Sequence, residues 1–488
     1  MLLWPSCCEV SASKVTGETT EPAKTNGHGP GRCAYATLLY GSGVEYFLGA
    51  LVLGWSLRAR GCEAERLLLH TEDVPLPFLE ALEKVWLLRQ VDYLHGDKAM
   101  FYNWDESRFQ EMQAHCLLIY PPVYQMVRVM VLGGYGGTGR PVSRRLMEQL
   151  PCEVVVAGRD LRRAQAFAEA LAEEFPGRDV TGARVDARDA ASLKAALQSI
   201  DLLIVTTTTP DAIPSIVQAA LATNTDTIDV MFKADVYDRL AEMKTEILSS
   251  GRRVITQAGC HPGLVAPLVK YASQSLAQVH SARVFMAFGS FFDSPSSARE
   301  LIEECAISSA RVLECGTWRD ATYKDSAQCS FGGTFGNLEC YPLRMLELEA
   351  LDVASLGLRD AGSYAAGFNW FVDYLVLPSA MVLGRRSVDC LTGIFNWAVR
   401  FFGARGDGVV FRAELEGTSQ KGQSRRHSVT ITSPDAYDFT AVAVVSCVAQ
   451  ILDGSITPPG LHLMGSVVDP DRTIRDVQRM GATLTWQD

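Results

Sequence analysis

The sequence predicts an α/β protein, in which a doubly wound parallel sheet is followed by an α+β second domain and preceded by a partial α/β fragment. Three observations lead to this fold class. Apolar strands and helices alternate regularly over residues 127–263, a glycine-rich turn follows the first of these strands, and a later pair of segments is typical of a β-hairpin. A chain of 488 residues is also too long for one ordinary core, so several domains are expected.

The composition narrows the class of protein. Hydrophobic residues make up 48% of the chain and charged residues 21%, which is ordinary for a globular protein. The formal net charge of -11 argues against nucleic acid as the main partner, because phosphate binding needs a basic face. The 13 cysteines are odd in number and show no metal-ligand spacing, so we expect no metal site, free thiols and a cytoplasmic location.

The chain before residue 127 divides into three parts. Residues 1–32 are rich in Ser, Thr, Gly, Lys and Glu, which predicts a disordered leader. Residues 33–110 form the partial α/β fragment, and residues 111–126 carry no pattern and form a linker. In the fragment we expect strands at Tyr35–Leu39 and Arg66–His70 and helices at Tyr46–Arg60 and Pro75–Trp86.

Residues 127–263 form the expected doubly wound domain. Six apolar strands alternate there with helices, which indicates a parallel sheet with helices on both faces. Six strands are what a complete doubly wound nucleotide domain requires. The expected strands are Arg128–Leu132, Glu153–Ala157, Val180–Asp186, Leu202–Thr206, Thr227–Met231 and Arg253–Gln257.

The remaining chain is expected to form the α+β second domain, residues 264–435, and a C-terminal helix and tail, residues 436–488, that return to the doubly wound domain. Two alternating segments around a polar, Gly-containing turn indicate a β-hairpin, and hairpins belong to antiparallel sheets. The expected elements are a helix through Ala277, a strand at Ala282–Ala287, hairpin strands at Val409–Gly417 and Arg425–Thr432, and a helix at Thr440–Leu452.

The most apolar stretch of the later chain runs from Tyr364 to Gly384. Asp373 and Pro378 interrupt it, and two arginines stop it, so it is a poor membrane span. We expect a buried core helix or helix pair here. Contact with a membrane or lipid surface is the alternative that the stretch leaves open.

The glycine-rich turn matches the pattern G-x-G-x-x-G directly after an apolar strand and before a helix, which is the context that makes the pattern informative. We expect Gly134 to permit the tight turn, Gly136 to let the backbone approach a pyrophosphate, and Gly139 to let the helix pack close to the strand. The alternative is a turn with no ligand. The expected cofactor-binding residues of the turn are Gly134, Tyr135, Gly136, Gly137, Thr138 and Gly139.

The end of the second strand favours NADP(H) over NAD(H). Arg159 stands where NAD enzymes usually place an acid, and a guanidinium suits a 2′-phosphate. Asp160 follows it, so NAD stays open. Asp186 is expected either at the adenine edge or in a cap or turn. Thr206 and Thr207 are expected to border the nicotinamide-side path, or else to satisfy local backbone groups.

From Val127 onward the chain resembles the saccharopine dehydrogenase-like family, also called saccharopine reductase-like. That resemblance implies a Rossmann domain, an α+β second domain and pyridine-nucleotide oxidoreduction on a small-molecule substrate. The best-known members reduce an imine formed between an amino acid and an aldehyde, but many have no assigned substrate. The matching segments are Val129–Arg140, Val156–Asp160, Ala258–Gly263, Tyr437–Thr440 and Pro459–Gly465.

Candidate substrate-site residues are few. His261 follows the sixth strand, and its usual pKa range would suit proton donation to an imine; a structural histidine capping a carbonyl is the alternative. Cys260 has no evident base partner, which indicates a small buried thiol. Arg319 and Arg344 are candidates for binding substrate carboxylates.

The N-terminal fragment resembles the opening of a glycogenin-like glycosyltransferase at Ala34–Leu39, Gly49–Leu57 and Asn103–Asp105. That family holds its metal with an Asp-x-Asp motif, and none occurs between residues 34 and 126. A fragment without those ligands cannot position a diphosphate by that mechanism. We therefore interpret it as a truncated, inactive remnant or as an artefact of gene prediction.

Three functions compete. The leading hypothesis is an NADP-dependent oxidoreductase that reduces an imine, a carbonyl or an activated double bond. The second is a non-catalytic nucleotide-binding or lipid-surface protein of the same fold, which the apolar segments Phe368–Leu383 and Leu391–Phe402 motivate. The third is glycosyl transfer by the N-terminal fragment. A homodimer is an additional partner hypothesis.

Overall fold

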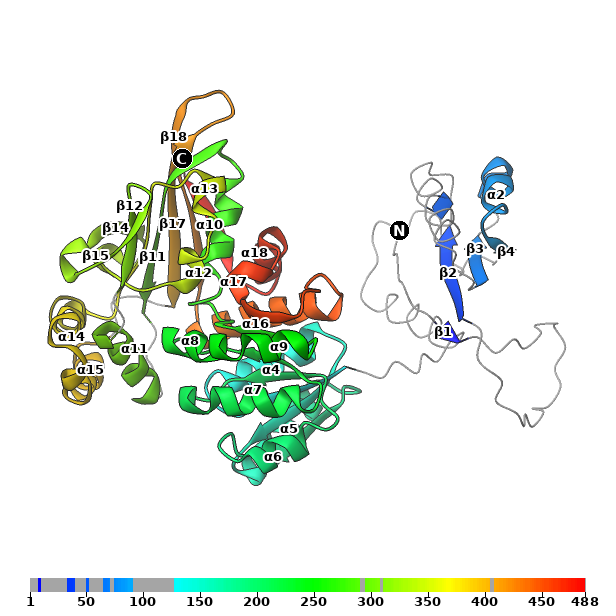
Figure 1. Ribbon diagram of the computed structural model, residues 1–488, viewed down its shortest axis with the longest axis horizontal. Coiled ribbons are helices and arrows are strands. Elements are labelled where there is room, and N and C mark those ends of the chain that lie inside the picture. The colour runs from blue at the N-terminus through cyan, green and yellow to red at the C-terminus, as the bar shows by residue number, and fades with distance from the viewer. Residues whose placement is uncertain are drawn as a thin grey trace. The chain divides into compact units, whose positions relative to one another are not determined.

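The computed structural model of the chain contains two compact units, residues 1–124 and residues 125–488, and each is described by itself (Figure 1). The structure describes the following residues: 8–9, 33–39, 50–51, 65–70, 74–90, 127–289, 295–307, 310–403 and 408–487.

The N-terminal unit contains a four-stranded sheet in the order β1-β2-β3-β4, in which β2, β3 and β4 run parallel. The two expected strands are confirmed, and the second expected helix is shorter than predicted. The helix expected at 46–60 lies outside the described residues, apart from the helical residues 50 and 51. Strand β1 lies within the leader that was expected to be disordered. The elements are β1 (Cys8–Glu9), β2 (Cys33–Leu39), β3 (Glu65–His70), α2 (Leu76–Leu82) and β4 (Leu87–Gln90).

The second unit is built around a seven-stranded, wholly parallel sheet in the order β19-β10-β9-β8-β5-β6-β7. All six expected strands are present with small shifts in their bounds, and the α/β fold class is confirmed. The strands are β5 (Arg128–Leu132), β6 (Glu153–Gly158), β7 (Val180–Arg184), β8 (Leu202–Val205), β9 (Asp226–Asp229), β10 (Arg253–Thr256) and β19 (Gly460–Leu463).

Helices cover both faces of this sheet because successive strand residues point to opposite sides. Val129 and Val131 of β5 pack in one hydrophobic cluster with α4 and α5, whereas Met130 and Leu132 pack in another with α6, α7, α8 and α9. The helices are α4 (Gly139–Gln149), α5 (Leu161–Glu174), α6 (Ala190–Ala196), α7 (Ile213–Leu221), α8 (Ala234–Glu242) and α9 (Lys244–Ser249).

The second domain of the larger unit is built around a nine-stranded mixed sheet, which we call the second sheet (Figure 1). The expected hairpin is confirmed, with its two strands paired antiparallel along their full length. Helix α10 (Val265–Ser273) ends four residues before the expected Ala277. The strands are β11 (Gln278–Phe288), β12 (Arg311–Glu314), β13 (Thr317–Asp320), β14 (Ala327–Gly332), β15 (Gly336–Pro342), β16 (Asp360–Ala366), β17 (Val409–Thr418), β18 (Ser424–Ser433) and β20 (Thr483–Gln487).

Three helices pack together beside the second sheet: α11 (Pro295–Ile307), α14 (Leu377–Leu383) and α15 (Val388–Phe402). The expected buried helix at 364–384 is wrong in part. Its first residues belong to β16, and α14 leaves Val382 and Leu383 exposed. No helix in the described part of the chain is long and apolar enough to cross a membrane.

The two sheets share one hydrophobic core. Helix α16 (Ala436–Leu452) lies between them, packing on α4 and burying Phe439 against the core side of β17. It is apolar on nearly every side, as expected of a helix enclosed by other elements. This shared core fixes the ends of the nucleotide-domain strands against the second sheet.

Candidate active site

The glycine-rich turn joins β5 to α4 and is shaped by close backbone approaches. Gly133 has the positive φ of the turn, +91°, and lies one residue before Gly134, which was expected to permit the tight turn. A Cβ on Gly134 would lie 2.8 Å from the Val131 carbonyl oxygen, and one on Gly139 would lie 2.0 Å from the Gly133 carbonyl oxygen. These glycines therefore let α4 begin directly against the end of β5.

The open side of this turn fits a pyrophosphate. A Cβ on Gly136 would meet only the Gly133 carbonyl oxygen within 4 Å, so the backbone there faces free space. Thr138, at the N-cap of α4, makes no side-chain capping bond. The N–H groups of Gly137, Thr138 and Gly139 have no backbone acceptor among the described residues, so they remain available to a ligand. Free N–H groups and the helix dipole favour an anion at this point.

Tyr135 and Arg159 lie at the end of β6, where the 2′-phosphate on the ribose of NADP(H) would bind. The Tyr135 ring covers Gly158, its hydroxyl accepts the Asp160 backbone N–H at 2.9 Å, and the Arg163 guanidinium carbon is 4.9 Å from the ring centroid. The Asp160 carboxylate accepts the Arg163 backbone N–H as the N-cap of α5. Because the Asp160 side chain caps α5, it is not free to bind a ribose hydroxyl. The exposed Arg159 beside it can bind a phosphate.

The remaining residues expected to bind the cofactor follow β7 and β8. The Asp186 carboxylate accepts the Arg188 backbone N–H at 3.0 Å. This hydrogen bond corresponds to the second of the two expected roles, that of a turn residue. The Thr206 hydroxyl donates to the Leu132 carbonyl at 3.0 Å, and a Cβ on Gly133 would touch Thr206 and Thr207 at 2.9 Å. The threonines therefore satisfy local groups and also border the turn.

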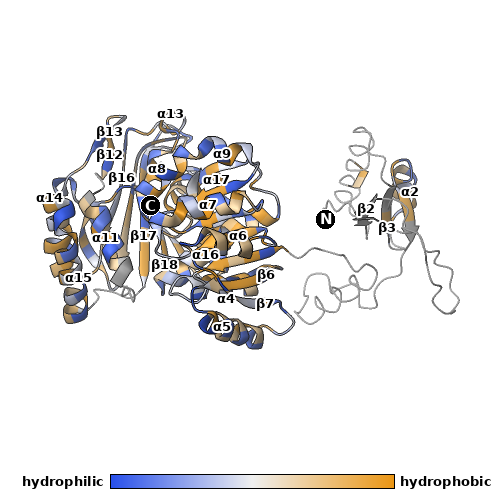
Figure 2. Ribbon diagram, turned by 60° about the horizontal axis from the view of Figure 1, so that its bottom comes forward, coloured by the Kyte–Doolittle hydropathy of each residue, from blue (hydrophilic) through white to orange (hydrophobic). Residues whose placement is uncertain are grey.

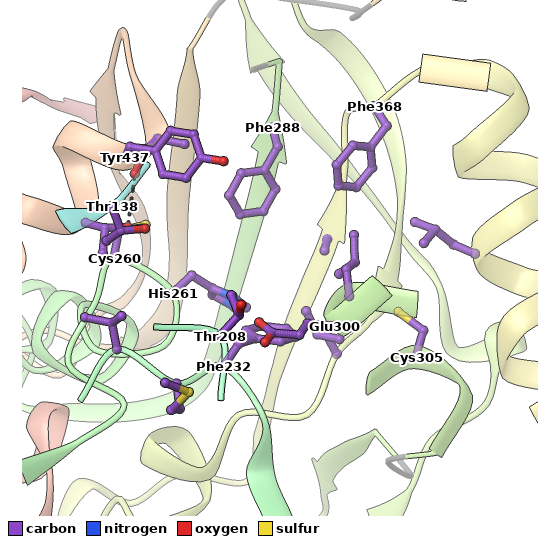
Figure 3. A pocket seen from close by; sticks show the side chains of 18 of the residues that line it. Thr138, Thr208, Phe232, Cys260, His261, Phe288, Glu300, Cys305, Phe368 and Tyr437 are labelled. Carbon is purple, nitrogen blue, oxygen red and sulfur yellow. Dashed lines mark hydrogen bonds between the residues drawn. The ribbon is translucent and has the colours of Figure 1, made fainter. Parts of the chain in front are cut away.

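A pocket extends from this turn to the second sheet and the three-helix cluster (Figure 3). It begins at Thr138 and Thr206–Thr208 and holds an empty volume of about 1310 Å³, open solvent included. Its lining is largely apolar. The other lining residues are Val230, Met231, Phe232, Cys260, His261, Phe288, Glu300, Leu301, Cys305, Tyr341, Pro342, Leu343, Ala365, Phe368, Leu377, Met381, Ala436, Tyr437 and Thr440.

His261 lies in the pocket wall among the rings of Phe232, Phe288 and Phe411, at centroid distances of 5.8, 6.4 and 6.0 Å. Its Nε2 is buried and has no hydrogen-bond partner. Burial lowers the pKa of His261 to about 3, so the ring is neutral at neutral pH. This burial opposes the titration near neutral pH that was expected of His261, although the residue does line the pocket.

Glu300, on α11, is a carboxylic acid in the pocket lining that sequence analysis missed. Burial raises the pKa of its carboxyl to about 7, while the charge of Lys233 opposes the shift. In Figure 3, Thr208, His261 and Glu300 point into the same part of the pocket, which we name the polar end. A carboxyl that stays protonated near neutral pH can donate a proton to a reacting oxygen or nitrogen.

The two arginines expected to bind substrate carboxylates lie elsewhere. Arg319 pairs with Glu314 and Asp325 on the exposed β13, and Arg344 pairs with Glu349. Neither lines the pocket. Cys260 is buried beside Thr440, which confirms the expected small buried thiol, and burial raises the pKa of this thiol to about 11.

Comparison with protein families identifies the nucleotide domain. Residues 129–255 match the family model described as the saccharopine dehydrogenase NADP binding domain. These residues run from β5 to β10 and include the glycine-rich turn, Arg159 and Thr206. The expected family resemblance and the NADP cofactor are therefore confirmed for this domain.

Comparison with solved structures identifies the fold of the larger unit. Apo saccharopine dehydrogenase (L-Glu forming) of Saccharomyces cerevisiae superposes with a TM-score of 0.54 and 17% sequence identity, covering 74% of this chain and 99% of that chain. A mutant meso-diaminopimelate dehydrogenase of Clostridium tetani gives a TM-score of 0.38 at 13% identity, covering 71% and 96%.

One curated relative matches a short stretch of the sequence. An uncharacterized protein of Acanthamoeba polyphaga mimivirus is 31% identical over 80 residues, which are 16% of this chain and 28% of the relative. The chain thus spans well under half the length of that relative. Neither the matched family model nor the superposed yeast structure is described as a glycosyltransferase, so the glycogenin-like resemblance gains no support from them.

Proposed function

We propose that this NADP-dependent oxidoreductase, built on a saccharopine dehydrogenase NADP-binding domain, transfers a hydride between NADP(H) and a small molecule bearing an imine or carbonyl group. The observation that carries the proposal is the pocket, which begins at the cofactor turn and ends at the second sheet. In doubly wound sheets, ligands bind in the crevice at the carboxyl ends of the strands, which is where Thr206 and Met231 border this pocket.

The chain's own residues supply the remaining requirements of such a reaction. When bound, NADPH supplies the hydride. Phe232, Phe288 and Phe368 form an apolar wall of the pocket. Such a wall excludes water from a bound substrate, and polar interactions are stronger where water is excluded. The Glu300 carboxyl holds a proton at the polar end, and His261 contributes a neutral ring to the pocket wall.

Cofactor titration tests the proposal. We expect the protein to bind NADPH more tightly than NADH, and Arg159→Ala to weaken NADPH binding by about tenfold while leaving NADH binding unchanged, because only NADPH carries the 2′-phosphate. Isothermal calorimetry measures both constants. Arg425→Ala, an exposed arginine on β18 without an ion pair among the described residues, is the matched control. Absence of binding to either nucleotide would contradict the proposal.

A second candidate function, contact with a lipid surface, is favoured by one surface feature. Large apolar side chains are exposed on and around α14 and α15, including Trp397 at 51%, Val382 at 64% and Phe401 at 69%. Apolar and polar residues alternate along the ribbons of these two helices (Figure 2). Exposed patches of this kind mark binding sites more often than inert surface. We name this group the aromatic patch; it comprises Trp370, Tyr374, Leu375, Val382, Leu383, Trp397, Phe401 and Phe402.

The charges near the aromatic patch favour an anionic lipid surface as its occupant. Arg385, Arg386 and Arg400 belong to the same helical region, and none forms an ion pair with a described residue. Apolar side chains that enter the interface, together with basic side chains that meet headgroups, are the combination that binds membranes peripherally.

Liposome flotation tests this second candidate. We expect the protein to float with vesicles of phosphatidylcholine and phosphatidylserine and less with phosphatidylcholine alone. The double variant Trp397→Ser, Phe401→Ser should lose flotation, whereas Leu248→Ser, an exposed leucine of the nucleotide domain, should not. Unchanged flotation of the double variant rejects the candidate. A dimer that the same variant dissociates in light scattering would assign the patch to a second copy instead.

The cysteines support a reducing, cytoplasmic location as part of the proposal. Every cysteine between residues 127 and 487 for which side chains are described is free, and five of these eight are buried. Burial raises the pKa of thiols such as Cys260 and Cys447, which keeps them unreactive.

A further inference from the structure

We infer that the pocket accepts a neutral, predominantly apolar carbonyl compound, and not an amino-acid-derived substrate that carries carboxylates. The inference rests on the proposed oxidoreductase function and specifies its substrate class. Three features of the pocket support it: the absence of cations in its described lining, the ion pairs that engage the cations nearby, and the separation of a polar end from an apolar end.

The described lining of the pocket offers a carboxylate no partner. None of the described lining residues is Lys or Arg, and the carboxyl present, Glu300, would repel an anion once ionised. The neutral ring of His261 supplies no positive charge either. A carboxylate in such surroundings loses its hydration without compensation, which is costly even after relaxation of the protein.

The cationic side chains near the pocket already have acidic partners. Lys233, which follows the lining residue Phe232, pairs with Glu303, and both side chains are less than one-fifth exposed. Arg344, which follows the lining residue Leu343, pairs with Glu349. To bind a carboxylate, either cation would have to leave a partner that is itself largely buried, so the ion pairs oppose anionic substrates.

The part of the pocket lined by Phe368 and α14 is apolar, and we name it the apolar end. Phe368 stacks on Phe288 at 6.1 Å between centroids, and Leu377 and Met381 of α14 complete this wall. A substrate with its carbonyl group at the polar end would therefore place a hydrocarbon substituent along α14. The next residue of α14, Val382, belongs to the aromatic patch, so one helix separates the apolar end from that surface.

The reaction balances with the groups present and the cofactor that the nucleotide domain binds. NADPH, held at the glycine-rich turn, would supply the hydride, and thus two electrons, to the carbonyl carbon. The π electrons of the carbonyl bond move to its oxygen, which takes the proton of the Glu300 carboxyl. The products are the alcohol and NADP⁺, and the carboxylate regains a proton from solvent.

Paired ligands of equal length test the inference. With the full chain saturated with NADP⁺, binding of 2-undecanone and of 10-oxoundecanoate is measured by calorimetry, and NADPH oxidation with each is followed by absorbance. We expect the neutral ketone to bind at least about tenfold more tightly than the oxo acid. Met381→Arg should reverse this preference by giving the carboxylate a partner, whereas Leu248→Arg, at an exposed position outside the pocket, should leave it unchanged.

The outcomes separate the inference from the proposed function. Equal or tighter binding of the oxo acid by the unmodified protein overturns the inference, as does failure of both ligands to bind. A preference that Met381→Arg leaves unchanged also overturns it, because the ligands would then lie outside this pocket. Oxidation of NADPH by amino-acid and keto-acid pairs alone overturns the substrate class but keeps the oxidoreductase. Absence of NADPH binding removes the proposed function itself.

Discussion

Two titratable residues at the polar end of the pocket have pKa values shifted in opposite directions by the same cause. Burial disfavours whichever form is charged, so it raises the pKa of Glu300 to about 7 and lowers that of His261 to about 3. Between these two values both side chains are uncharged. Within this range Glu300 is the group that holds a proton to donate, and His261 offers only a neutral ring.

Glu300→Gln is therefore expected to change the pH profile as well as the rate. In the reductive direction the unmodified protein should be fastest while Glu300 is protonated, with the rate falling as pH rises through about 7. The variant should lose about 10²- to 10⁴-fold in kcat and should lack this fall. Steady-state reduction rates between pH 5 and about 9 measure both effects.

The control for this prediction is Glu169→Gln, an exposed glutamate on α5, which should keep the unmodified profile. In the oxidative direction the sign reverses, because a carboxylate must then accept the proton, so the rate should rise through the same pH. A Glu300→Gln variant that retains the fall near pH 7 would show that another group donates the proton.

Single residues also show where sequence reasoning succeeds. The turn around Gly136 and the place of Arg159 after a strand were predictable, because the motif and its strand context are local in sequence, while their part in binding the cofactor stays a prediction. Glu300 was not, because it lies on α11 among other acidic residues, and only the fold brings that helix to the pocket. Arg319 and Arg344 were misassigned because sequence does not reveal that acidic neighbours engage them.

At the scale of elements, helix α10 shows how the His261 loop is held in place. The loop ends at Gly263, and α10 begins at Val265. The buried carboxylate of Glu347 accepts N–H groups from Gly263 at 2.6 Å, Val265 at 3.3 Å and Ala266 at 3.2 Å. A side chain of the second domain thus satisfies the free N–H groups at the start of this helix.

Glu347→Ala should therefore destabilise the protein. The variant leaves three buried N–H groups without their acceptor, and each such loss costs about 1 to 3 kcal/mol. We expect the free energy of unfolding, measured in urea, to fall by at least about 2 kcal/mol. Glu169→Ala should change it little, and an equal stability of the two variants would contradict the capping role.

Elements differ in how far sequence reveals them. The six strands of the nucleotide sheet were predictable because each is a buried apolar run between helices. The seventh, β19, was not, since it has four residues, follows Pro459 and pairs with β10, about two hundred positions earlier. The stretch around α14 was misjudged because apolar composition does not show which side chains face a core and which face solvent.

At the scale of the whole molecule, the C-terminal segment ties both sheets of the larger unit together. It adds β19 to one edge of the nucleotide sheet and β20 to one edge of the second sheet. Between these strands, α17 (Met464–Val467) and α18 (Pro470–Arg479) bury side chains against α10 and α16. The N-terminal unit, in contrast, has a small hydrophobic cluster of its own around Leu68 and Trp86.

Deletions at the two ends of the chain should therefore differ in their effect on the stability of the larger unit. Removing residues 1–126 should leave the thermal unfolding of the larger unit and its affinity for NADPH unchanged, because that unit has its own core. Removing residues 454–488 should abolish cooperative unfolding. It removes buried residues such as Met464, Ile474 and Val477, and losing each costs about 2 to 5 kcal/mol against a typical total stability of about 5 to 15 kcal/mol. Calorimetric scans and NADPH titration of both truncated proteins measure these effects. A cooperative transition in the protein without residues 454–488 would show that the C-terminal segment is not needed for folding. Loss of NADPH binding in the protein without residues 1–126 would show that the larger unit depends on the N-terminal unit.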